Sequence, residues 1–419
     1  MTAFLISLLI FLLIPTLLSR FFNINKLLPL VFLQLAFGFA LKLSGAVEWL
    51  QARQIDWSSG TLASSLEGLG WLGVVMLVAT AGSESVPRVS GRDRWQVLAI
   101  SVAGFAGTCL LGTALGFALA QLYPQAVGPA ARPWVFASSI GLALSVTALP
   151  VLAAIVRQGG IAHTSIGKMA MSCAVLDDLW LWLGMAVILS FGRAAAGIPW
   201  QLFGGLCVYL AVMAGAVRPA LRRYFDARAN PADADSFIVV VSVILLSAVA
   251  TGIIGLHSIF GAFVAGAILP KSAVNACRSY LDQVTHVLLL PPFFILTGLR
   301  LSIDLHSPQF WEQVVLVTSV AILGKMVMVA ITARLGGLRW RQSLALGSLM
   351  QCKGLMELIA INILLDAGIL GRELFSALAT MALISTFITL PLSRLLLDRR
   401  AHEPVVLGGP REVLSPGPR

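Results

Sequence analysis

Charge is the scarcest property of this 419-residue sequence, in which 11% of residues are charged and 58% are hydrophobic. A soluble protein carries about 25% charged residues, so the composition excludes an ordinary soluble domain. The mean hydropathy is +0.91, and apolar runs of about 20 residues follow one another along most of the chain. Alternating segments of about ten residues, typical of a membrane β-barrel, are absent. The sequence therefore predicts an all-α polytopic membrane protein.

Cysteine is also scarce, which limits the cofactors that the chain can hold. The five cysteines form no C-x-x-C pair, and they are Cys109, Cys173, Cys207, Cys277 and Cys352. This scatter indicates neither a disulfide framework nor a metal site, and we interpret the cysteines as small apolar packing residues. No cofactor is expected. The N-terminal run TAFLISLLIFLLIPTLL (2–18) lacks a basic segment and a cleavage site, so it is predicted to be a retained first helix.

Hydropathy predicts thirteen transmembrane helices, and the weakest boundary is the LHS sequence that interrupts a long apolar stretch at 256–258. The helices are expected at 3–19, 27–43, 61–81, 95–121, 134–157, 164–190, 200–217, 236–254, 257–270, 285–301, 311–334, 342–366 and 371–397. We expect residues 1–400 to form a single membrane domain. The polar segment 218–236 is expected to be a connector, and the Pro- and Gly-rich segment 401–419 a disordered cytoplasmic tail.

The net charge of +10 comes from basic residues in the predicted loops. Twenty-one of them lie on one side of the membrane, whereas six lie on the side of the N-terminus: Lys42, Arg53, Arg132, Arg193, Arg300 and Arg372. Basic residues concentrate in cytoplasmic loops, so the N-terminus is predicted to be outside and the C-terminus in the cytoplasm of an inner-membrane protein. The charge therefore gives no reason to expect a nucleic-acid partner.

Two adjacent aspartates, Asp177 and Asp178, lie within the apolar run SCAVLDDLWLWLGM (172–185). Each carboxylate costs about 2.5–3.5 kcal/mol at the centre of a membrane helix, and intramembrane charges usually mark function. Adjacent side chains point about 100° apart on a helix, so one is expected to face a water-filled cavity and the other a neighbouring helix. Lys325 is the candidate partner of the second. A buried cluster of this kind can exchange protons near neutral pH.

Two predicted helices carry interruptions at equivalent places in the two halves of the chain. SSIGLALSVTALPVLAAIV (138–156) contains Ser145, Thr147 and Pro150, and GSLMQCKGLMELIAINILLDAG (347–368) contains Lys353 and Glu357. Proline frees a carbonyl one turn back, and paired interrupted helices indicate an inverted-repeat transporter with a midplane site. The repeats would span 27–190 and 257–397. An ordinary proline kink and ion pairs that only hold helices together are the alternatives.

Several segments, in order, resemble the monovalent cation:proton antiporter superfamily. The resemblance is closest to the branch with bacterial Na⁺ or K⁺/H⁺ antiporters and plant cation/H⁺ exchangers, and it covers nearly the whole chain. The segments are LSVTALPVLAAIV (144–156), GKMAMSCAVLDDLWLW (167–182), GLHSIFGAFVAGAILP (255–270), PPFFILTGLRLSI (291–303) and KGLMELIAINILLDAGIL (353–370).

The resemblance implies a fold and roles for the charged residues. Two discontinuous helices, 134–157 and 342–366, would cross beside the ion site. Asp178 matches the aspartate that binds the cation or the proton in competition. Asp177 and Lys325 match a pair found in electrogenic members, and Glu357 matches the glutamate of the second broken helix.

The resemblance further implies how the transport domain is divided. Ion-binding core segments would lie at 95–190 and 311–397, scaffold and dimerisation segments at 1–81 and 236–301, and a linker helix at 200–217. The implied protein is a homodimer in a lipid bilayer that exchanges Na⁺, or K⁺, for H⁺ by alternating access, electrogenically and without being an enzyme.

The sequence departs from the pattern at a few positions. Lys353 stands where the superfamily usually has arginine, and Trp180 stands where a small residue is usual. Alternatives are an electroneutral K⁺/H⁺ exchanger and a non-transporting sensor built on the same fold. An intramembrane aspartyl protease is disfavoured, because its two carboxylates must face each other from separate helices and no GxGD motif is present.

Overall fold

The computed structural model describes residues 2–21, 30–52, 55–57, 60–84, 93–158, 160–193, 200–227, 233–304 and 306–396. In these parts of the chain the regular structure is helical, apart from one isolated antiparallel bridge between Val127 and Leu370. The predicted tail at 401–419 lies outside the described residues. The all-α class predicted from hydropathy is confirmed.

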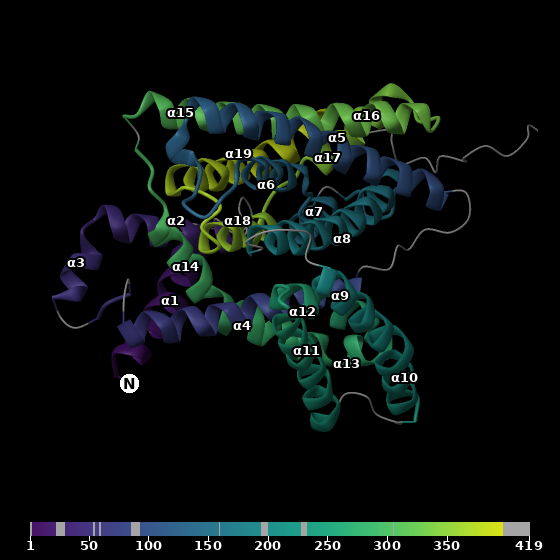
Figure 1. Cartoon of the computed structure of the whole chain (residues 1–419), viewed down its shortest axis with the longest axis horizontal. Helices are drawn as coiled ribbons and strands as arrows, with labels where there is room; N and C mark the ends of the chain where they lie inside the picture. Colours follow the sequence, from purple (N-terminus) through teal and green to yellow (C-terminus); the bar gives the residue numbers. More distant parts are fainter. Residues whose placement is uncertain are drawn as a thin grey trace, which may run out of the picture.

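The helices form two bundles, which lie one above the other in Figure 1. We call the upper one the core bundle, in which α5 packs against α6 and α16, and α15 packs against α19. It contains α5 (Asp93–Leu122), α6 (Pro133–Ser145), α7 (Leu149–Gln158), α8 (Ser165–Arg193), α15 (Pro308–Ser319), α16 (Lys325–Leu335), α17 (Trp340–Met350), α18 (Leu355–Asp366) and α19 (Arg372–Leu396). Both halves of the sequence therefore contribute to it.

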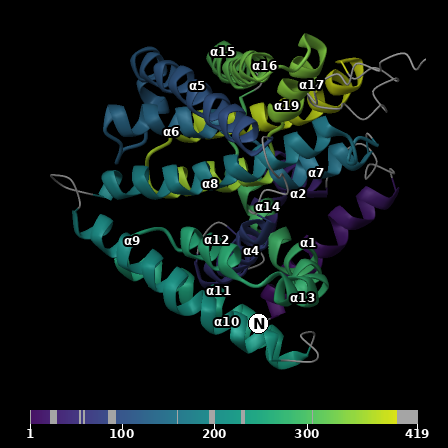
Figure 2. The same cartoon turned by 90° about the vertical axis from the view of Figure 1, so that its right-hand side faces the viewer.

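The lower group of helices is called the scaffold bundle here. In it, α4 packs against α12 and α14, and α2 packs against α14. It contains α1 (Thr2–Phe21), α2 (Leu30–Leu43), α3 (Ala46–Gln51), α4 (Gly60–Glu84), α11 (Ala234–Ile254), α12 (Ser258–Ile268), α13 (Lys271–Gln283) and α14 (Leu290–Arg300). The helical path of α9 (Trp200–Val212) and α10 (Arg218–Asp226) runs along its outer edge in Figure 2.

Every predicted hydrophobic segment coincides with a helix. Among the described residues, ten helical segments are long and apolar enough to cross a membrane, or eleven when the bent pair α17–α18 is taken as one span. The apolar helices α2 and α12 are shorter. Thirteen crossings therefore remain a prediction, whereas the weak boundary at 254–257 is confirmed: Gly255 ends α11 with a φ of 93° and His257 caps α12.

Two predicted boundaries were wrong, because amphipathic helical turns extend the apolar spans. The helix predicted at 200–217 continues through a π turn (Met213–Val217) and α10 to Asp226, so the connector predicted at 218–236 is partly helical. The helix predicted at 285–301 begins at Lys271 and passes through a second π turn, Val284–Leu289. In α13, Ala273, Cys277 and Leu281 repeat every four residues and are buried. Average hydropathy does not detect such a stripe.

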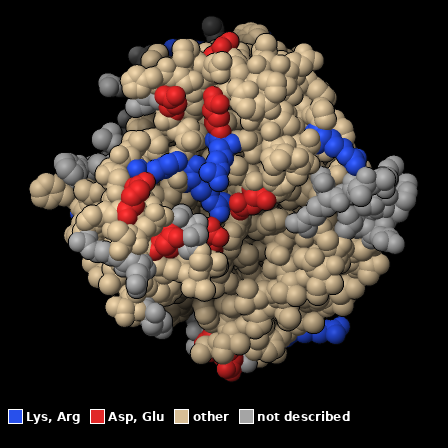
Figure 3. Space-filling view, turned by 60° about the vertical axis from the view of Figure 1, so that its left-hand side comes forward, with Lys and Arg blue, Asp and Glu red and all other residues tan. Residues whose placement is uncertain are grey.

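The surface agrees with a membrane setting. In Figure 3, apolar and neutral residues cover most of the face, and charged side chains gather around a central basic group. That face is the end of the molecule on the left of Figure 1, where α14 and α18 end and α15 begins.

Close contacts between α4 and α12 depend on glycine. A Cβ built on Gly82 would overlap the carbonyl oxygen of Phe263, and one on Gly266 would overlap that of Ala79. Small residues allow backbones to approach in membrane proteins. In contrast, a Cβ on Gly68, in the same helix α4, would meet nothing within 4 Å.

We therefore predict that Gly82→Ala destabilises the protein by about 1–3 kcal/mol, the usual cost of overpacking. Gly68→Ala is the matched control and is expected to be neutral or slightly stabilising, because alanine favours helix over glycine. Thermal unfolding of the purified protein in detergent, followed by tryptophan fluorescence, measures both. Equal melting temperatures for the two variants would contradict the prediction.

Candidate ion-binding site

The first broken helix is interrupted between α6 and α7, at residues 146–148. Pro150 lies in the first turn of α7, where its missing N–H is tolerated. The same missing N–H removes the helical hydrogen-bond donor for the carbonyl group of Val146, four residues earlier. Val146 instead adopts an extended conformation and ends α6. The predicted interruption is thus present, and it leaves carbonyl oxygens available inside the core bundle.

The second broken helix is interrupted between α17 and α18, which are bent by 47° relative to each other. Its non-helical segment crosses the first one directly: the Ala148 N–H donates to the carbonyl oxygen of Cys352 at 3.0 Å. Gly354 allows this close approach, because a Cβ there would lie 2.6 Å from Val151 Cγ2 and would force a shift. The two discontinuous helices therefore meet at their breaks.

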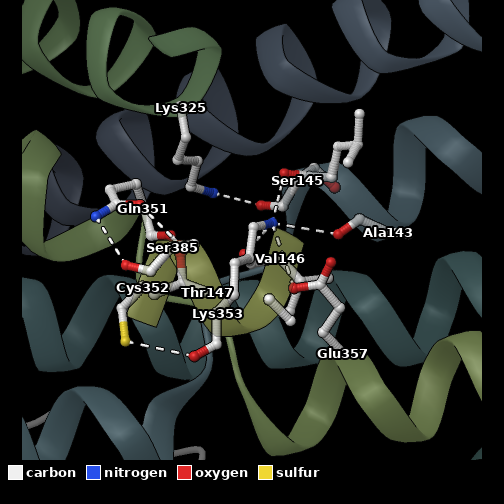
Figure 4. Close-up of polar contacts among 12 residues, drawn as sticks. Ala143, Ser145, Val146, Thr147, Lys325, Gln351, Cys352, Lys353, Glu357 and Ser385 are labelled. Carbon is white, nitrogen blue, oxygen red and sulfur yellow. Dashed lines mark hydrogen bonds and ion pairs between the residues drawn. The ribbon is translucent and has the colours of Figure 1, made fainter. Parts of the chain in front are cut away.

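The ammonium group of Lys353 lies among the backbone carbonyl oxygens at the C-terminal end of α6 (Figure 4). Its Nζ donates to the carbonyl oxygens of Ala143, Leu144 and Val146 at 3.2, 2.6 and 2.8 Å. An ammonium group has three donors, so each has an acceptor, including the carbonyl freed by Pro150. The side chain is fully buried. Lys353 thus neutralises the negative end of the α6 dipole, and this contact needs only the compact charge that lysine supplies.

Lys325 approaches the same helix end from the opposite side. Its Nζ lies 2.6 Å from the carbonyl oxygen of Ser145 and 2.6 Å from Asp177 Oδ2, and both charged side chains are fully buried. A π turn at Val320–Gly324 immediately precedes Lys325, and π turns are frequent at functional sites. Lys325 and Asp177 therefore form a buried ion pair between α16 and α8, although they are far apart in the sequence.

Asp177 receives two further hydrogen bonds. The Ser101 hydroxyl on α5 donates to its Oδ1 at 2.9 Å. The Thr147 hydroxyl, in the first break, lies 2.7 Å from Asp177 Oδ2 and 2.5 Å from the carbonyl oxygen of Met350 at the end of α17. Both carboxylate oxygens of Asp177 thus have partners, which a buried charge requires. The Asp177 carboxylate and the Thr147 hydroxyl link α5, α8, α16 and both broken helices.

The other predicted site residues lie close to this crossing. Asp178 follows Asp177 on α8 and is 1% exposed. Glu357 is fully buried in the first turn of α18, with its Oε2 3.9 Å from Lys353 Nζ. An acidic residue is favourable at a helix N-terminus. The structure therefore brings together at one crossing the residues that the sequence placed in separate helices.

Several polar residues around the crossing were not predicted. Ser101 is a serine in an apolar helix and gave no distinctive signal. Gln351 holds the second break against α19: the Ser385 hydroxyl donates to the Gln351 carbonyl oxygen at 2.7 Å, and Gln351 Nε2 donates to Thr389 Oγ1 at 2.6 Å. Thr386 donates to the Lys353 carbonyl oxygen at 2.7 Å. The i, i+4 spacing of Ser385 and Thr389 on α19 was the available signal.

The site contains isolated carboxylates rather than a multidentate metal cage. Among the described residues, no group of three or more His, Cys, Asp or Glu side chains is placed to hold a metal ion. Crossed broken helices around buried charges define a class of secondary transporter. The chain belongs to the sodium/hydrogen exchanger family, because the family model described as sodium/hydrogen exchanger, transmembrane, matches residues 7–396.

Individual relatives agree with this membership. Cation/H(+) antiporter 18 of Arabidopsis thaliana is 32% identical over 334 residues, which is 78% of this chain and 41% of that protein. The Na(+)/H(+) antiporter NhaS4 of Synechocystis sp. is 34% identical over 280 residues, which is 64% of this chain and 67% of that protein. The chain thus spans about two fifths of the length of its plant relative.

A solved structure has the same fold. The sodium proton antiporter MjNhaP1 from Methanocaldococcus jannaschii matches with a TM-score of 0.66 over 96% of this chain and 99% of that chain, at 14% identity. The overall fold is therefore shared, although few residues are identical.

Breaking the buried ion pair should cost stability. We predict that Lys325→Met lowers the free energy of unfolding by about 3–5 kcal/mol, because it leaves Asp177 charged and buried without its counter-ion. Lys325→Met combined with Asp177→Asn should recover most of this loss, since neither position of the pair then carries an uncompensated buried charge.

Thermal unfolding of the wild type, both single variants and the double variant forms a double-mutant cycle that isolates the pair. Additive losses, with no recovery in the double variant, would show that the two side chains do not interact.

Proposed function

We propose that this chain is a secondary antiporter that exchanges a monovalent cation for H⁺ by alternating access, with Asp178 as the exchange site. The observation that carries the proposal is a second buried carboxylate, Asp178, the next residue on α8 after Asp177, whose ion pair with Lys325 lies at the crossing of two broken helices. Intramembrane ionisable residues in such positions mark ion or proton pathways. Family membership and the names of the cation/H⁺ and Na⁺/H⁺ antiporter relatives support it.

Competition at one carboxylate accounts for exchange. A carboxylate that binds either a cation or a proton is neutralised in both cases, and charge neutralisation lowers the cost of moving it through the low-dielectric interior. The empty, charged carboxylate is the costly state. A carrier of this kind therefore changes conformation when Asp178 is loaded, which couples the two ions in opposite directions.

The ion pair beside Asp178 supplies a route to a second proton. A cation bound at Asp178 would place positive charge near Lys325, whose ammonium group is held by Asp177 and by the Ser145 carbonyl oxygen. Like charges repel each other, so the cation at Asp178 and the Lys325 ammonium group would be electrostatically coupled. Asp177 would keep hydrogen bonds from Ser101 and Thr147. More than one proton per monovalent cation makes the exchange electrogenic.

The bundles suggest how access alternates. We assign the moving, ion-carrying part to the core bundle and the fixed, dimer-forming part to the scaffold bundle, with α9 as the linker. Na⁺ is the proposed cation and K⁺ the alternative. We place the protein in the inner membrane as a homodimer, with its N-terminus outside and its C-terminus in the cytoplasm, because this orientation obeys the distribution of basic residues.

The exchange site is tested in proteoliposomes that contain a pH-sensitive dye. Gradients of Na⁺, K⁺ or Li⁺ should each be assayed, and Asp178→Asn should abolish proton movement with every cation that the wild type transports. Asp282→Asn is the control, because that carboxylate lies on α13, is 41% exposed and pairs with Arg278. Full activity of Asp178→Asn would overturn the assignment, and an inactive but folded wild type would favour a non-transporting sensor.

The charge stoichiometry is tested with an imposed membrane potential. Each net charge moved per cycle couples about 2.3 kcal/mol per 100 mV, so the wild-type rate should change with the sign of the potential. Asp177→Asn should weaken this dependence, because Lys325 then loses its counter-ion and the second proton site. A wild-type rate that does not respond to the potential would indicate electroneutral exchange.

A further inference from the structure

The C-terminal end of α14 is held by the scaffold bundle. Arg300, the last residue of α14, places its Nη2 2.9 Å from Glu67 Oε1 on α4. Lys42, on α2, donates its Nζ to the carbonyl oxygen of Leu301 at 2.6 Å. The side chains of Glu67 and Lys42 therefore fix this end of α14 within its own bundle.

The same segment also contacts the core bundle. Arg300 Nη1 lies 2.7 Å from Asp366 Oδ1, at the last residue of α18, and 3.5 Å from Asn362 Oδ1 one turn earlier. Two residues beyond Arg300, the Ser302 N–H donates to the Ser376 hydroxyl on α19 at 2.7 Å. One guanidinium group thus pairs with a carboxylate in each bundle.

The position of this contact links it to the broken helix. Asp366 ends α18, the helix that starts at the crossing with Glu357 in its first turn. A shallow pocket, lined by Glu67 of α4, Thr297 and Arg300 of α14 and Asn362 of α18, lies between the bundles beside the pair.

The geometry points to Arg300 as a latch between the two bundles. We propose that the Arg300–Asp366 pair stabilises the conformation seen here and must break each time the core bundle moves relative to the scaffold bundle, an inference that rests on the proposed alternating access. Glu67 retains Arg300 on the scaffold side when the latch opens. The rigid guanidinium fork suits this double role, whereas lysine offers a single point charge.

Two carboxylates provide a matched pair of variants. Glu67 and Asp366 bind the same guanidinium group and are 41% and 40% exposed. Asp366→Asn weakens the contact between the bundles, whereas Glu67→Gln weakens a contact within the scaffold bundle. The chemistry of the change is the same in both, so a difference between the variants reports the interface itself.

The readout is the accessibility of the interface rather than transport. Thr297 lines the pocket and is 2% exposed, so a water-soluble maleimide should label Thr297→Cys slowly. The variant is made in a Cys207→Ser background, and labelling of the same protein without Thr297→Cys is subtracted. Asp366→Asn should raise the labelling rate by about two- to five-fold, the range expected for a partly exposed ion pair, whereas Glu67→Gln should not.

The dependence of labelling on salt concentration provides a second test of the ion pair. High ionic strength screens exposed ion pairs. It should therefore raise the rate of Thr297→Cys labelling when Arg300 and Asp366 are unchanged, and have little effect on that rate after Asp366→Asn. If Asp366→Asn does not fold, Arg300→Lys replaces it and should also raise labelling. Equal labelling of the wild type, Asp366→Asn and Arg300→Lys, with no salt effect, would overturn the latch. Failure of antiport would leave these labelling results interpretable, because no ion gradient is used.

Discussion

The structure depends on one constraint: four helix ends meet inside the core bundle, where the residues of both breaks are buried. Unsatisfied backbone groups in such a place cost several kcal/mol each. Two of these backbone groups satisfy each other, because the Ala148 N–H in the first break donates to the Cys352 carbonyl oxygen in the second. Side chains satisfy other groups at these ends, and for this reason charged and hydroxyl residues gather at a depth where they are otherwise rare.

The helix ends at the crossing are met by different kinds of side chain. The C-terminal end of α6 receives two lysines, Lys353 and Lys325, whereas the Gln351 carbonyl oxygen, just beyond the end of α17, accepts a hydrogen bond from the Ser385 hydroxyl. Asp177 binds the hydroxyl that precedes α7, and Glu357 lies in the first turn of α18. Each lysine thus lies beside a carboxylate as well as the carbonyl groups of α6: Lys325 pairs with Asp177, and Lys353 lies 3.9 Å from Glu357.

The contacts within the two bundles differ from the contacts between them. Within the scaffold bundle, glycine contacts such as Gly82 against Phe263 bring backbones together. Between the bundles, the partly exposed pair of Arg300 and Asp366 contributes a contact of the kind that is individually weak. Tight packing inside each bundle and reversible ionic contact between them are what rigid-body movement requires, since packed interiors do not deform continuously.

Local composition was enough to predict the membrane class, the apolar segments and the intramembrane position of Asp177 and Asp178, because the transfer free energy of a segment depends on its own residues. It was also enough to predict the proline and glycine interruptions, because backbone conformation depends on nearby residues. Local composition did not predict helix α13, because its apolar stripe is lost when hydropathy is averaged over all of its residues. The structure alone showed that Lys353 serves the α6 carbonyls, that Ser101 binds Asp177 and that Arg300, predicted only as a loop charge, joins two bundles. Each of these contacts joins residues 66 to 210 positions apart, and only tertiary packing determines which distant groups share one buried space.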